Sequence, residues 1–135
     1  MKILAIAFAL AAGFLAAAHA GQPATIQPSA VPAWIKATPA AQILDVRTKE
    51  EFATGHLAKA VLIPWTDSDF KARVVKELDK EKPVLVYCRS GRRSAEAAAA
   101  MVKLGFKDVR NLEGGVIKWT KDGQALVTPT PDGHP

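Results

Sequence analysis

The sequence predicts an α/β fold, in which a small parallel β-sheet carries α-helices on both faces. Two observations indicate this fold: short apolar runs alternate along the chain with segments of helical pattern, and the run at residues 83–87 is apolar throughout. Alternating strands and helices form βαβ units with parallel strands. A strand without polar alternation is typical of a central strand that helices cover on both faces. The chain has 135 residues, a length that suits one domain rather than two complete cores.

The first half of the predicted domain holds two strands, each followed by a helix. Residues 42–46 and 60–63 are the apolar runs that predict the strands. Residues 48–52 begin with Thr48, a residue type that caps helix N-termini, and continue with two glutamates, which favours a short helix. Residues 67–78 carry apolar side chains at helical spacing and predict a longer helix.

The second half of the domain continues the alternation. Residues 83–87 are the third strand, and residues 92–104 are an alanine-rich helix that Gly105 is suited to end. Residues 107–112 are the fourth strand, and residues 115–120 form a last helical turn. The third strand and the helix after it are therefore joined by a short loop at the carboxyl edge of the sheet, where open α/β sheets place their ligand sites.

The start of the chain has the layout of a secretory signal peptide. Lys2 is followed by an apolar run of about 16 residues and by Ala-His-Ala, which places the expected cleavage after Ala20. The alternative is an uncleaved membrane anchor, but the run is shorter than the ~20 residues that a spanning helix needs. We therefore expect residues 1–20 to be removed and the protein to be exported, most simply to a bacterial periplasm, with no stable membrane anchor.

The mature chain, residues 21–135, is expected to form a single domain whose core covers about residues 28–120. Residues 21–30 are rich in Pro and small residues, and they are predicted to be a lead-in with little structure. Residues 128–135 contain three prolines and a glycine, and they are predicted to be a frayed tail.

Charge and cysteine content exclude several classes of function. The chain has 18 Lys and Arg against 13 Asp and Glu, a formal net charge of +5 that does not by itself argue for a nucleic-acid partner. Its one cysteine, Cys88, rules out an intramolecular disulfide and a multi-cysteine zinc or iron–sulfur site within one chain. Because an unpaired thiol is a liability in an oxidising compartment, Cys88 is expected to have a chemical function.

The loop that begins at Cys88 combines three features that favour a bound anion. It leads into a helix N-terminus, Gly91 permits a tight turn that directs several N–H groups inward, and three arginines lie within five residues of the sulfur. We therefore expect Cys88 to be a thiolate at neutral pH. The residues expected to bind an anionic substrate are Arg89, Ser90, Gly91, Arg92, Arg93 and Ser94. For Arg93, a solvated position on the helix surface is an equal alternative.

A thiolate in an anion-binding loop suits two chemistries. Phosphate ester cleavage through a phosphocysteine uses Cys, five intervening residues and Arg, but position 94 is Ser and Arg93 lies one residue short of that spacing. In sulfur transfer the thiolate attacks the outer sulfur of an anionic donor and becomes a persulfide. The short loop fits a single sulfur atom better than a phosphoryl group, so sulfur transfer is the preferred hypothesis, and it needs no metal or organic cofactor.

Three separated segments of the chain resemble single-domain members of the rhodanese (thiosulfate sulfurtransferase) family, and the expected export resembles that of its small periplasmic members. Residues 44–64 contain Leu-Asp-Val-Arg, Glu-Phe, Gly-His-Leu and Ile-Pro in the order of its first signature. Residues 88–94, Cys-Arg-Ser-Gly-Arg-Arg-Ser, match its active loop, and residues 112–119, Leu-Glu-Gly-Gly-Val-Ile-Lys-Trp, match its closing signature. The resemblance covers nearly all of the mature chain and implies a small parallel-sheet rhodanese-like domain.

The resemblance implies that Cys88 carries the sulfane sulfur of thiosulfate, or of a similar anionic donor, as a persulfide. It also implies that backbone groups of the loop bind the anion, and that Arg89 and Arg92 contact the donor. The acceptor would be cyanide or a thiol. The alternative function is a non-enzymatic persulfide carrier or sensor that binds a protein partner.

Three further residues, Asp45, Arg47 and Trp65, are candidates for supporting roles. Asp45 ends a strand near the site and is expected to accept hydrogen bonds from the loop or to pair with Arg47 or with a loop arginine. Arg47 is expected to form an ion pair with Glu51 at i+4. Trp65 follows a strand end and is expected to line the mouth of the site. His56 is expected to be structural, because attack by an ionised thiolate needs no general base.

Overall fold

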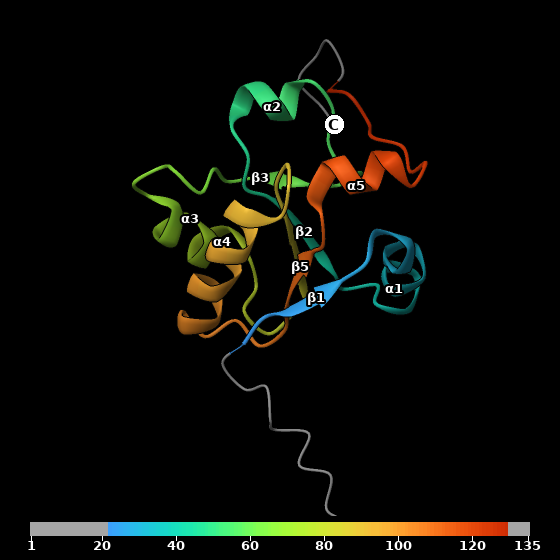
Figure 1. The fold of residues 1–135 in the computed structure, drawn as a ribbon. Helices are drawn as coiled ribbons and strands as arrows, with labels where there is room; N and C mark the ends of the chain where they lie inside the picture. The colour runs from blue at the N-terminus through green and yellow to red at the C-terminus, as the bar shows by residue number, and fades with distance from the viewer. Residues whose placement is uncertain (1–21, 130–135) are drawn as a thin grey trace, which may run out of the picture.

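The computed structural model describes residues 22–129, which form a parallel β-sheet with helices on both faces, as the sequence predicts (Figure 1). The five strands lie in the order β1-β5-β4-β2-β3, and all neighbouring pairs are parallel. The central strand is β4, and all of its residues are buried. The apolar run at residues 83–87 therefore occupies the place that its composition predicts.

The helices and strands predicted from residue 42 onward are all present, with ends that differ by at most three residues from the prediction. The strands are β1 (Ala24–Ile26), β2 (Gln42–Asp45), β3 (Val61–Leu62), β4 (Val84–Tyr87) and β5 (Val109–Leu112). The helices are the 3-10 helix η1 (Pro28–Ala30), α1 (Val31–Ala37), α2 (Lys49–Ala53), α3 (Phe70–Glu77), α4 (Arg92–Lys103) and α5 (Gly115–Lys121).

Local sequence signals account for two helix ends near the carboxyl edge of the sheet. Thr48 caps α2: its hydroxyl oxygen accepts the N–H of Glu51, and the Glu51 carboxylate accepts the N–H of Thr48. Gly91 is the N-cap of α4 and has a φ of 99°, in the left-handed region that favours glycine. The turn between Cys88 and α4 is thus one that Gly91 permits, as expected from the sequence.

The prediction that residues 21–30 have little structure is wrong. Residues 24–26 form β1, which pairs with β5, and η1 and α1 follow it directly. Only the last residue of β1, Ile26, is buried, so the segment has no apolar pattern of its own. It becomes a strand because the outer edge of β5 offers it backbone hydrogen-bond partners, which a short stretch of sequence cannot reveal.

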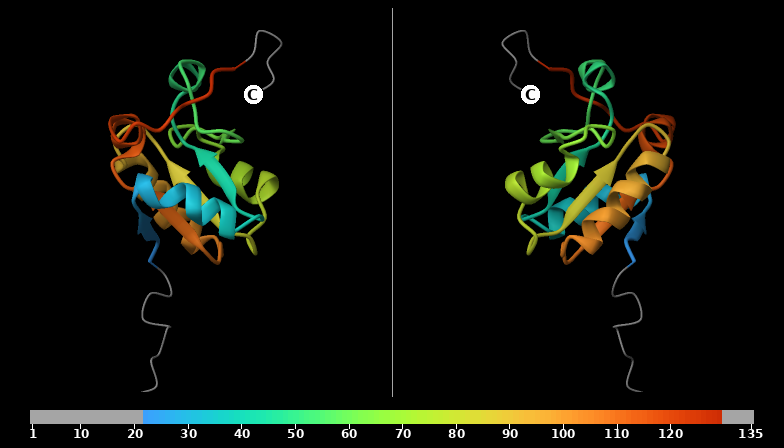
Figure 2. Two further views of the ribbon diagram at one scale, coloured as in Figure 1. Left: turned by 90° about the vertical axis from the view of Figure 1, so that its right-hand side faces the viewer. Right: turned by 90° about the vertical axis from the view of Figure 1, so that its left-hand side faces the viewer.

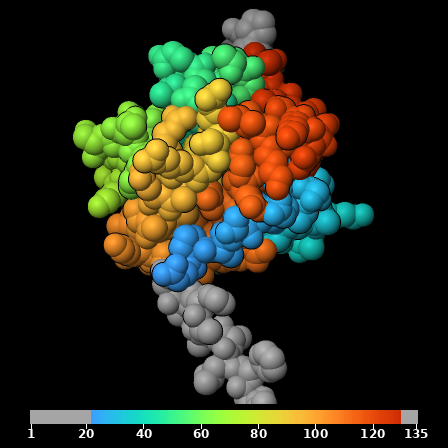
Figure 3. All heavy atoms as spheres, viewed as in Figure 1, coloured from blue at the N-terminus to red at the C-terminus, as the bar shows by residue number. Residues whose placement is uncertain are grey.

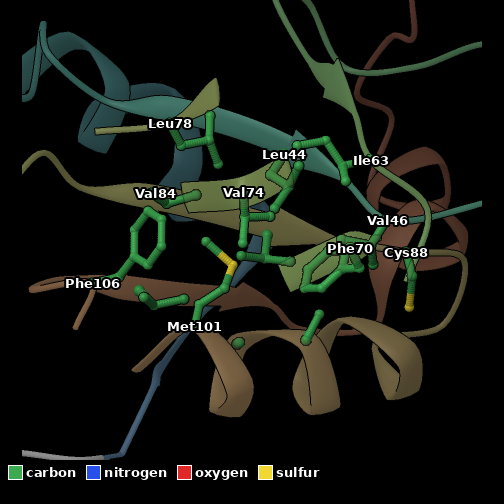
Figure 4. Close-up of a cluster of buried hydrophobic side chains, with 14 residues drawn as sticks. Leu44, Val46, Ile63, Phe70, Val74, Leu78, Val84, Cys88, Met101 and Phe106 are labelled. Atoms are coloured by element: carbon green, nitrogen blue, oxygen red, sulfur yellow. The ribbon is translucent and has the colours of Figure 1, made fainter. Parts of the chain in front are cut away.

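Two apolar cores lie on opposite faces of the sheet. Alternate residues of a strand point to opposite faces, so Val84 and Val86 of β4 pack against α3 and α4, whereas Leu85 and Tyr87 pack against α1 and α5. Figure 4 shows the first of these cores, and the opposite views in Figure 2 show the helices on each side of the sheet. Both cores hold β4 in place up to its carboxyl end, where the candidate site begins.

Two predictions about the chain ends lie partly or wholly outside the described residues. The predicted signal peptide, residues 1–20, is outside them, as are residues 130–135 of the predicted tail. Thr128 and Pro129, at the start of that tail, belong to no helix or strand. Within residues 22–129, no helix is both long enough and apolar enough to span a membrane.

Candidate active site

Cys88 follows the last residue of β4, and its side chain packs into the core that α3 and α4 cover (Figure 4). The residue is only 1% exposed. Its sulfur accepts a hydrogen bond from the backbone N–H of Gly91 at 3.1 Å and another from the Ser94 hydroxyl at 3.3 Å. The loop therefore curls around the sulfur, and donors that follow Cys88 by three and six residues converge on one atom.

Two opposing effects act on the ionisation of the Cys88 thiol. Burial raises its pKa, whereas hydrogen bonds from the Ser94 hydroxyl and from the backbone N–H groups of Ser94, Gly91 and Ser90 lower it. The hydrogen bonds prevail, and the pKa of Cys88 lies below its ordinary value. The main stabilisers of the thiolate are thus uncharged donors of the loop; the sequence predicts a joint contribution from the helix N-terminus, the N–H groups and the arginine charges.

The start of α5 fixes the orientation of the loop. The N–H groups of Val116 and Ile117 donate to the carbonyl oxygens of Cys88 and Arg89, each at 3.0 Å. Because a trans peptide holds its C=O and N–H on opposite sides, these bonds turn the following N–H groups away from α5. This orientation agrees with the contribution of the Ser90 N–H to the lowered pKa of Cys88.

Gly115 lets α5 approach the loop this closely. A Cβ at this position would lie 2.5 Å from the carbonyl oxygens of both Cys88 and Arg89, and the residue has a φ of 58°. On the other side of the turn, the Asn111 side chain donates to the Gly91 carbonyl oxygen at 3.2 Å. Groups from β5 and α5 therefore hold the backbone of the loop from outside.

The three arginines of the loop have different surroundings. Arg89 and Arg92 are exposed, and no described residue forms an ion pair or side-chain hydrogen bond with either. Arg93 instead binds both carboxylate oxygens of Glu51, at 2.8 and 2.9 Å. Hydrogen bonding to Arg93 lowers the pKa of Glu51 to about 2. The structure thus places Arg93 as a link between α4 and α2.

The predicted ion pair between Arg47 and Glu51 is wrong. The Arg47 guanidinium binds the Asp45 carboxylate at 2.7 Å, and both side chains are almost completely buried. It also donates to the Gly55 carbonyl oxygen at 2.7 Å. The i+4 rule fails here because α2 begins only after Arg47, whereas the turn after β2 already brings the Arg47 N–H within 2.9 Å of the Asp45 carboxylate.

Trp65 lies beside α4, where its indole N–H donates to Glu96 at 3.1 Å and its ring packs edge-on against Phe70. It lines a surface cavity of about 400 Å³ that runs along α4.

His56 is completely buried, stacks on Phe52 at 3.9 Å, and lies with Nδ1 at 2.9 Å from the Leu57 carbonyl oxygen. These surroundings agree with a structural role for His56.

A cavity of about 430 Å³ adjoins the loop between α2 and α5, and Arg89 and Arg47 contribute to its lining. Figure 3 shows the loop, in yellow, next to α2, in green, and α5, in orange-red. A larger cavity of about 600 Å³ is lined by residues such as Ile35 and Val61 and includes no residue of the loop. Of these cavities, the one between α2 and α5 is the one whose lining includes a residue of the loop.

The fold and the cysteine loop match a known protein family. A family model described as "Rhodanese-like domain" matches residues 28–122. The chain belongs to the rhodanese-like domain family. The match includes β2 to α5 and the whole of the loop from Cys88 to Ser94.

Individual relatives of this rhodanese-like domain agree with the family match. A "Sulfurtransferase" of Allochromatium vinosum is 36% identical over 87 residues, which are 64% of this chain and 78% of that protein. "Thiosulfate sulfurtransferase 18" of Arabidopsis thaliana is 39% identical over 89 residues, 58% of this chain and 65% of that protein. A crystal structure of a rhodanese-related protein from Thermoplasma volcanium has a TM-score of 0.67 and 32% identity, and the match covers 77% of this chain and 97% of that one. These relatives support sulfur transfer as the general chemistry of the domain.

Three groups that position the loop were not predicted from the sequence to do so. Glu51 holds Arg93 across 42 positions, Asn111 holds Gly91 across 20, and the first N–H groups of α5 hold the loop carbonyls. Only the last of these has a signal in the sequence, since residues 112–119 match the closing signature of rhodanese-like domains. Its two glycines have different physical reasons: Gly115 allows α5 to approach the loop, whereas Gly114 has a φ of 72° and a Cβ there would meet the Lys118 side chain at 2.5 Å.

Proposed function

We propose that this rhodanese-like domain is a thiosulfate sulfurtransferase in which Cys88 carries sulfur as a persulfide. The observation that supports this most directly is the convergence of the Gly91 N–H and the Ser94 hydroxyl on the Cys88 sulfur. Those donors lower the pKa of the thiol and so raise the fraction of the attacking thiolate at a given pH. The same donors suit a persulfide anion, which carries its charge close to the same place.

In the first step the Cys88 thiolate attacks the outer sulfur of thiosulfate. A bond forms between the two sulfurs, the sulfur–sulfur bond of thiosulfate breaks, and sulfite leaves with the electron pair. The exposed guanidinium groups of Arg89 and Arg92 bind the sulfonate oxygens, for which their planar donor sets are suited. No proton moves in this step, so it needs no general base.

In the second step an acceptor, cyanide or a thiolate, attacks the outer sulfur of the persulfide. The bond between that sulfur and Cys88 breaks, and the Cys88 thiolate is regenerated. Backbone groups of Ser90, Gly91 and Ser94 stabilise the anion in both states of the cysteine. We assign Arg93 the positioning of the α4 start through Glu51, because its guanidinium is already bound.

Asp45, Arg47 and Trp65 support the site from its sides. The Asp45–Arg47 pair fixes the turn at the end of β2, the strand that pairs with β4. Trp65 packs against the core beneath α4 and binds Glu96 of that helix. We propose that none of these three side chains contacts the sulfur that is transferred.

We further propose that the protein works after export, as a mature chain of residues 21–135 in a bacterial periplasm. The signal-peptide layout of residues 1–20 supports this location. Its substrates would be a small anionic sulfur donor and a small acceptor, with no nucleic acid and no stable membrane anchor. The intact mass of the protein isolated from its source tests the cleavage: a chain that begins at Gly21 is expected, and one that retains Met1 would contradict it.

The activity is tested by incubating the purified protein with thiosulfate and cyanide and measuring thiocyanate. We expect turnover by the wild type and none by Cys88→Ser, whose hydroxyl is not ionised at neutral pH. Wild-type-like thiocyanate production by Cys88→Ser would overturn the assignment. Substantial Cys88-dependent hydrolysis of an aryl phosphate would instead favour the phosphocysteine chemistry.

A persulfide carrier that passes sulfur to a protein partner is the second candidate. Two observations favour it: the Cys88 sulfur is buried, which would protect a persulfide, and Ile117 is 47% exposed beside the loop. Poor thiocyanate production together with one stable extra sulfur in the intact mass would support the carrier. Rapid multiple turnover with cyanide would exclude it as the main function.

A further inference from the structure

We propose that the cavity between α2 and α5 selects the sulfur acceptor, and that the acceptor it fits is a small zwitterionic thiol of the amino-acid type. This inference rests on the proposed function, because the acceptor would attack a persulfide on Cys88. It goes further in naming the class of acceptor and the residues that recognise it. The cavity has a volume of about 430 Å³, which accommodates a molecule of this size.

The cavity adjoins the loop at Arg89, and two of its other lining residues bind groups of the loop and of the α4 start. Arg89, the residue after Cys88, lines it directly. Glu51 also lines it, and the Glu51 carboxylate binds Arg93 at the start of α4. The opposite wall includes Val116, whose N–H donates to the Cys88 carbonyl oxygen. A thiol bound here would therefore lie next to the segment that carries the persulfide (Figure 1).

The charges that line the cavity leave one cation and one anion available. The charge of Arg47 is balanced by Asp45 at 2.7 Å, and the charge of Glu51 is balanced by Arg93 at 2.8 Å. Glu50 and Arg89 are both exposed, and within residues 22–129 neither side chain forms an ion pair or a hydrogen bond. A ligand with one carboxylate and one ammonium group matches this pair, the carboxylate on Arg89 and the ammonium on Glu50.

The remaining lining suits the carbon skeleton of such a ligand. Val116 and Ile117 contribute apolar surface, and Ile117 is 47% exposed. Arg89 is free for the acceptor because the sulfite produced in the first step has left the site. One guanidinium can thus bind the sulfonate of the donor and then the carboxylate of the acceptor, in an order that the two steps impose.

The transfer to such a thiol balances without any further reactant. The thiol loses its proton to solvent, and its thiolate forms a bond with the outer sulfur of the Cys88 persulfide. The sulfur–sulfur bond to Cys88 breaks, its electron pair stays on the Cys88 sulfur, and the acceptor leaves as a small-molecule persulfide. Two anions enter the step and two anions leave it, with no net oxidation.

The test separates donor chemistry from acceptor recognition. The full-length mature protein is loaded with thiosulfate, freed of small molecules by gel filtration, and checked by intact mass for one extra sulfur. The rate of persulfide loss is then measured with three thiols: L-cysteine, N-acetyl-L-cysteine without the ammonium group, and L-cysteine methyl ester without the carboxylate. Comparing each thiol with itself across protein variants cancels the intrinsic reactivity of the thiol.

The deciding variants are Glu50→Gln and Glu50→Lys. We expect Glu50→Gln to slow transfer to L-cysteine and to its methyl ester by about two- to fivefold, the effect of losing one exposed ion pair, and to leave N-acetyl-L-cysteine unaffected. Glu50→Lys should slow the first two thiols further and accelerate N-acetyl-L-cysteine. Glu81→Gln and Glu81→Lys, at an exposed turn before β4 and outside the cavity, are the matched charge controls and should change none of the three rates.

Two results would overturn the inference while leaving the proposed function intact. One is that the persulfide forms but the Glu50 and Glu81 variants behave alike with all three thiols. The other is that Glu50→Gln slows all three thiols equally, which would indicate a general effect on the loop. If no persulfide forms in the wild type, the proposed function itself fails, and the inference fails with it.

Discussion

β2 and β4 are neighbouring strands that end at the same edge of the sheet, but the polar groups at their carboxyl ends have different surroundings. At the end of β2, Asp45 and Arg47 form a buried ion pair, so each charge is balanced by the other. After β4, donors converge on the Cys88 sulfur, while Arg89 is exposed and has no partner among the described residues. The first turn is closed on itself and stabilises the fold, whereas the second directs its donors at the sulfur and leaves an exposed arginine beside it.

This difference shows why a charged residue at a strand end is not by itself a site. In a buried ion pair each charge has lost its hydration, so each side chain is stabilised mainly by the other. A reactive thiolate needs the reverse arrangement, in which the surrounding groups supply donors and the reacting atom accepts them. Substitutions around the two turns are therefore expected to differ in their effects on stability and on chemistry.

The largest effect is expected from removing the sulfur itself. Cys88→Ser should reduce persulfide formation from thiosulfate to background, because the hydroxyl is not a nucleophile at neutral pH. The folded state should be nearly as stable as that of the wild type, because Ser retains a small side chain that can bond Gly91 and Ser94. Intact mass after thiosulfate treatment measures persulfide formation, and thermal unfolding measures stability. A large loss of stability would indicate that Cys88 has a mainly structural role.

Breaking the closed turn should affect stability rather than chemistry. Asp45→Asn leaves Arg47 buried without its counter-charge and is expected to lower the free energy of unfolding by about 3–5 kcal/mol. Asp108→Asn is the matched control, since Asp108 and Arg110 form an ion pair with the same spacing that is 34–38% exposed and is worth at most about 1 kcal/mol after solvent screening. Denaturant unfolding measures the free energy of unfolding of both variants. Equal losses of stability would contradict the idea that burial makes the Asp45–Arg47 pair more important.

Pushing α5 away from the loop should affect both stability and chemistry. Gly115→Ala places a Cβ 2.5 Å from two loop carbonyl oxygens at a φ of 58°, and we expect a loss of about 1–3 kcal/mol together with slower persulfide formation. Gly123→Ala isolates the backbone cost, because Gly123 has a φ of 83° but no atom within 4 Å of the added Cβ. Single-turnover rates that fall equally in both variants would argue against the contact with α5 as the cause.

Removing one donor from the turn after β4 should change the pH dependence of the reaction. Ser94→Ala deletes the hydroxyl that bonds the Cys88 sulfur and lowers its pKa, so the pKa of the thiol should rise. The thiolate fraction then falls at a given pH, and the rising limb of the rate profile moves to higher pH. The loss of rate should be largest at acidic pH and fade at alkaline pH; a uniform loss across the profile would indicate a steric cause instead.

The smallest effect is expected from the link between α2 and α4. Arg93 holds the folded-state pKa of Glu51 at about 2, below the ordinary 4.5, so the pair stabilises the fold fully above pH 4.5 and less as the pH falls through about 2. Glu51→Gln keeps the helix cap on Thr48 but removes the charge, and it should cost less than about 1 kcal/mol at neutral pH because the pair is partly exposed. The difference between variant and wild type should vanish towards pH 2; a difference that persists there would contradict the ionic link.

The sequence by itself determined the alternation of strands and helices, the central position of residues 84–87 and the place of Cys88 at the carboxyl edge. These features depend on periodicity, burial and turn chemistry within about ten residues of chain, which is the range over which a sequence can be interpreted locally. The turn at Gly91 and the cap at Thr48 were predictable for the same reason.

The tertiary structure alone decided which polar groups meet. Glu51 binds Arg93 rather than Arg47, β1 forms only because β5 offers it an edge, and α5 binds the carbonyl oxygens of Cys88 and Arg89. Each of these contacts joins segments that are far apart in the chain, so its partners are selected by packing and not by local spacing. For that reason the sequence could identify the cysteine, but not the groups that lower its pKa most, nor that Arg89 and Glu50 have no side-chain partner within residues 22–129.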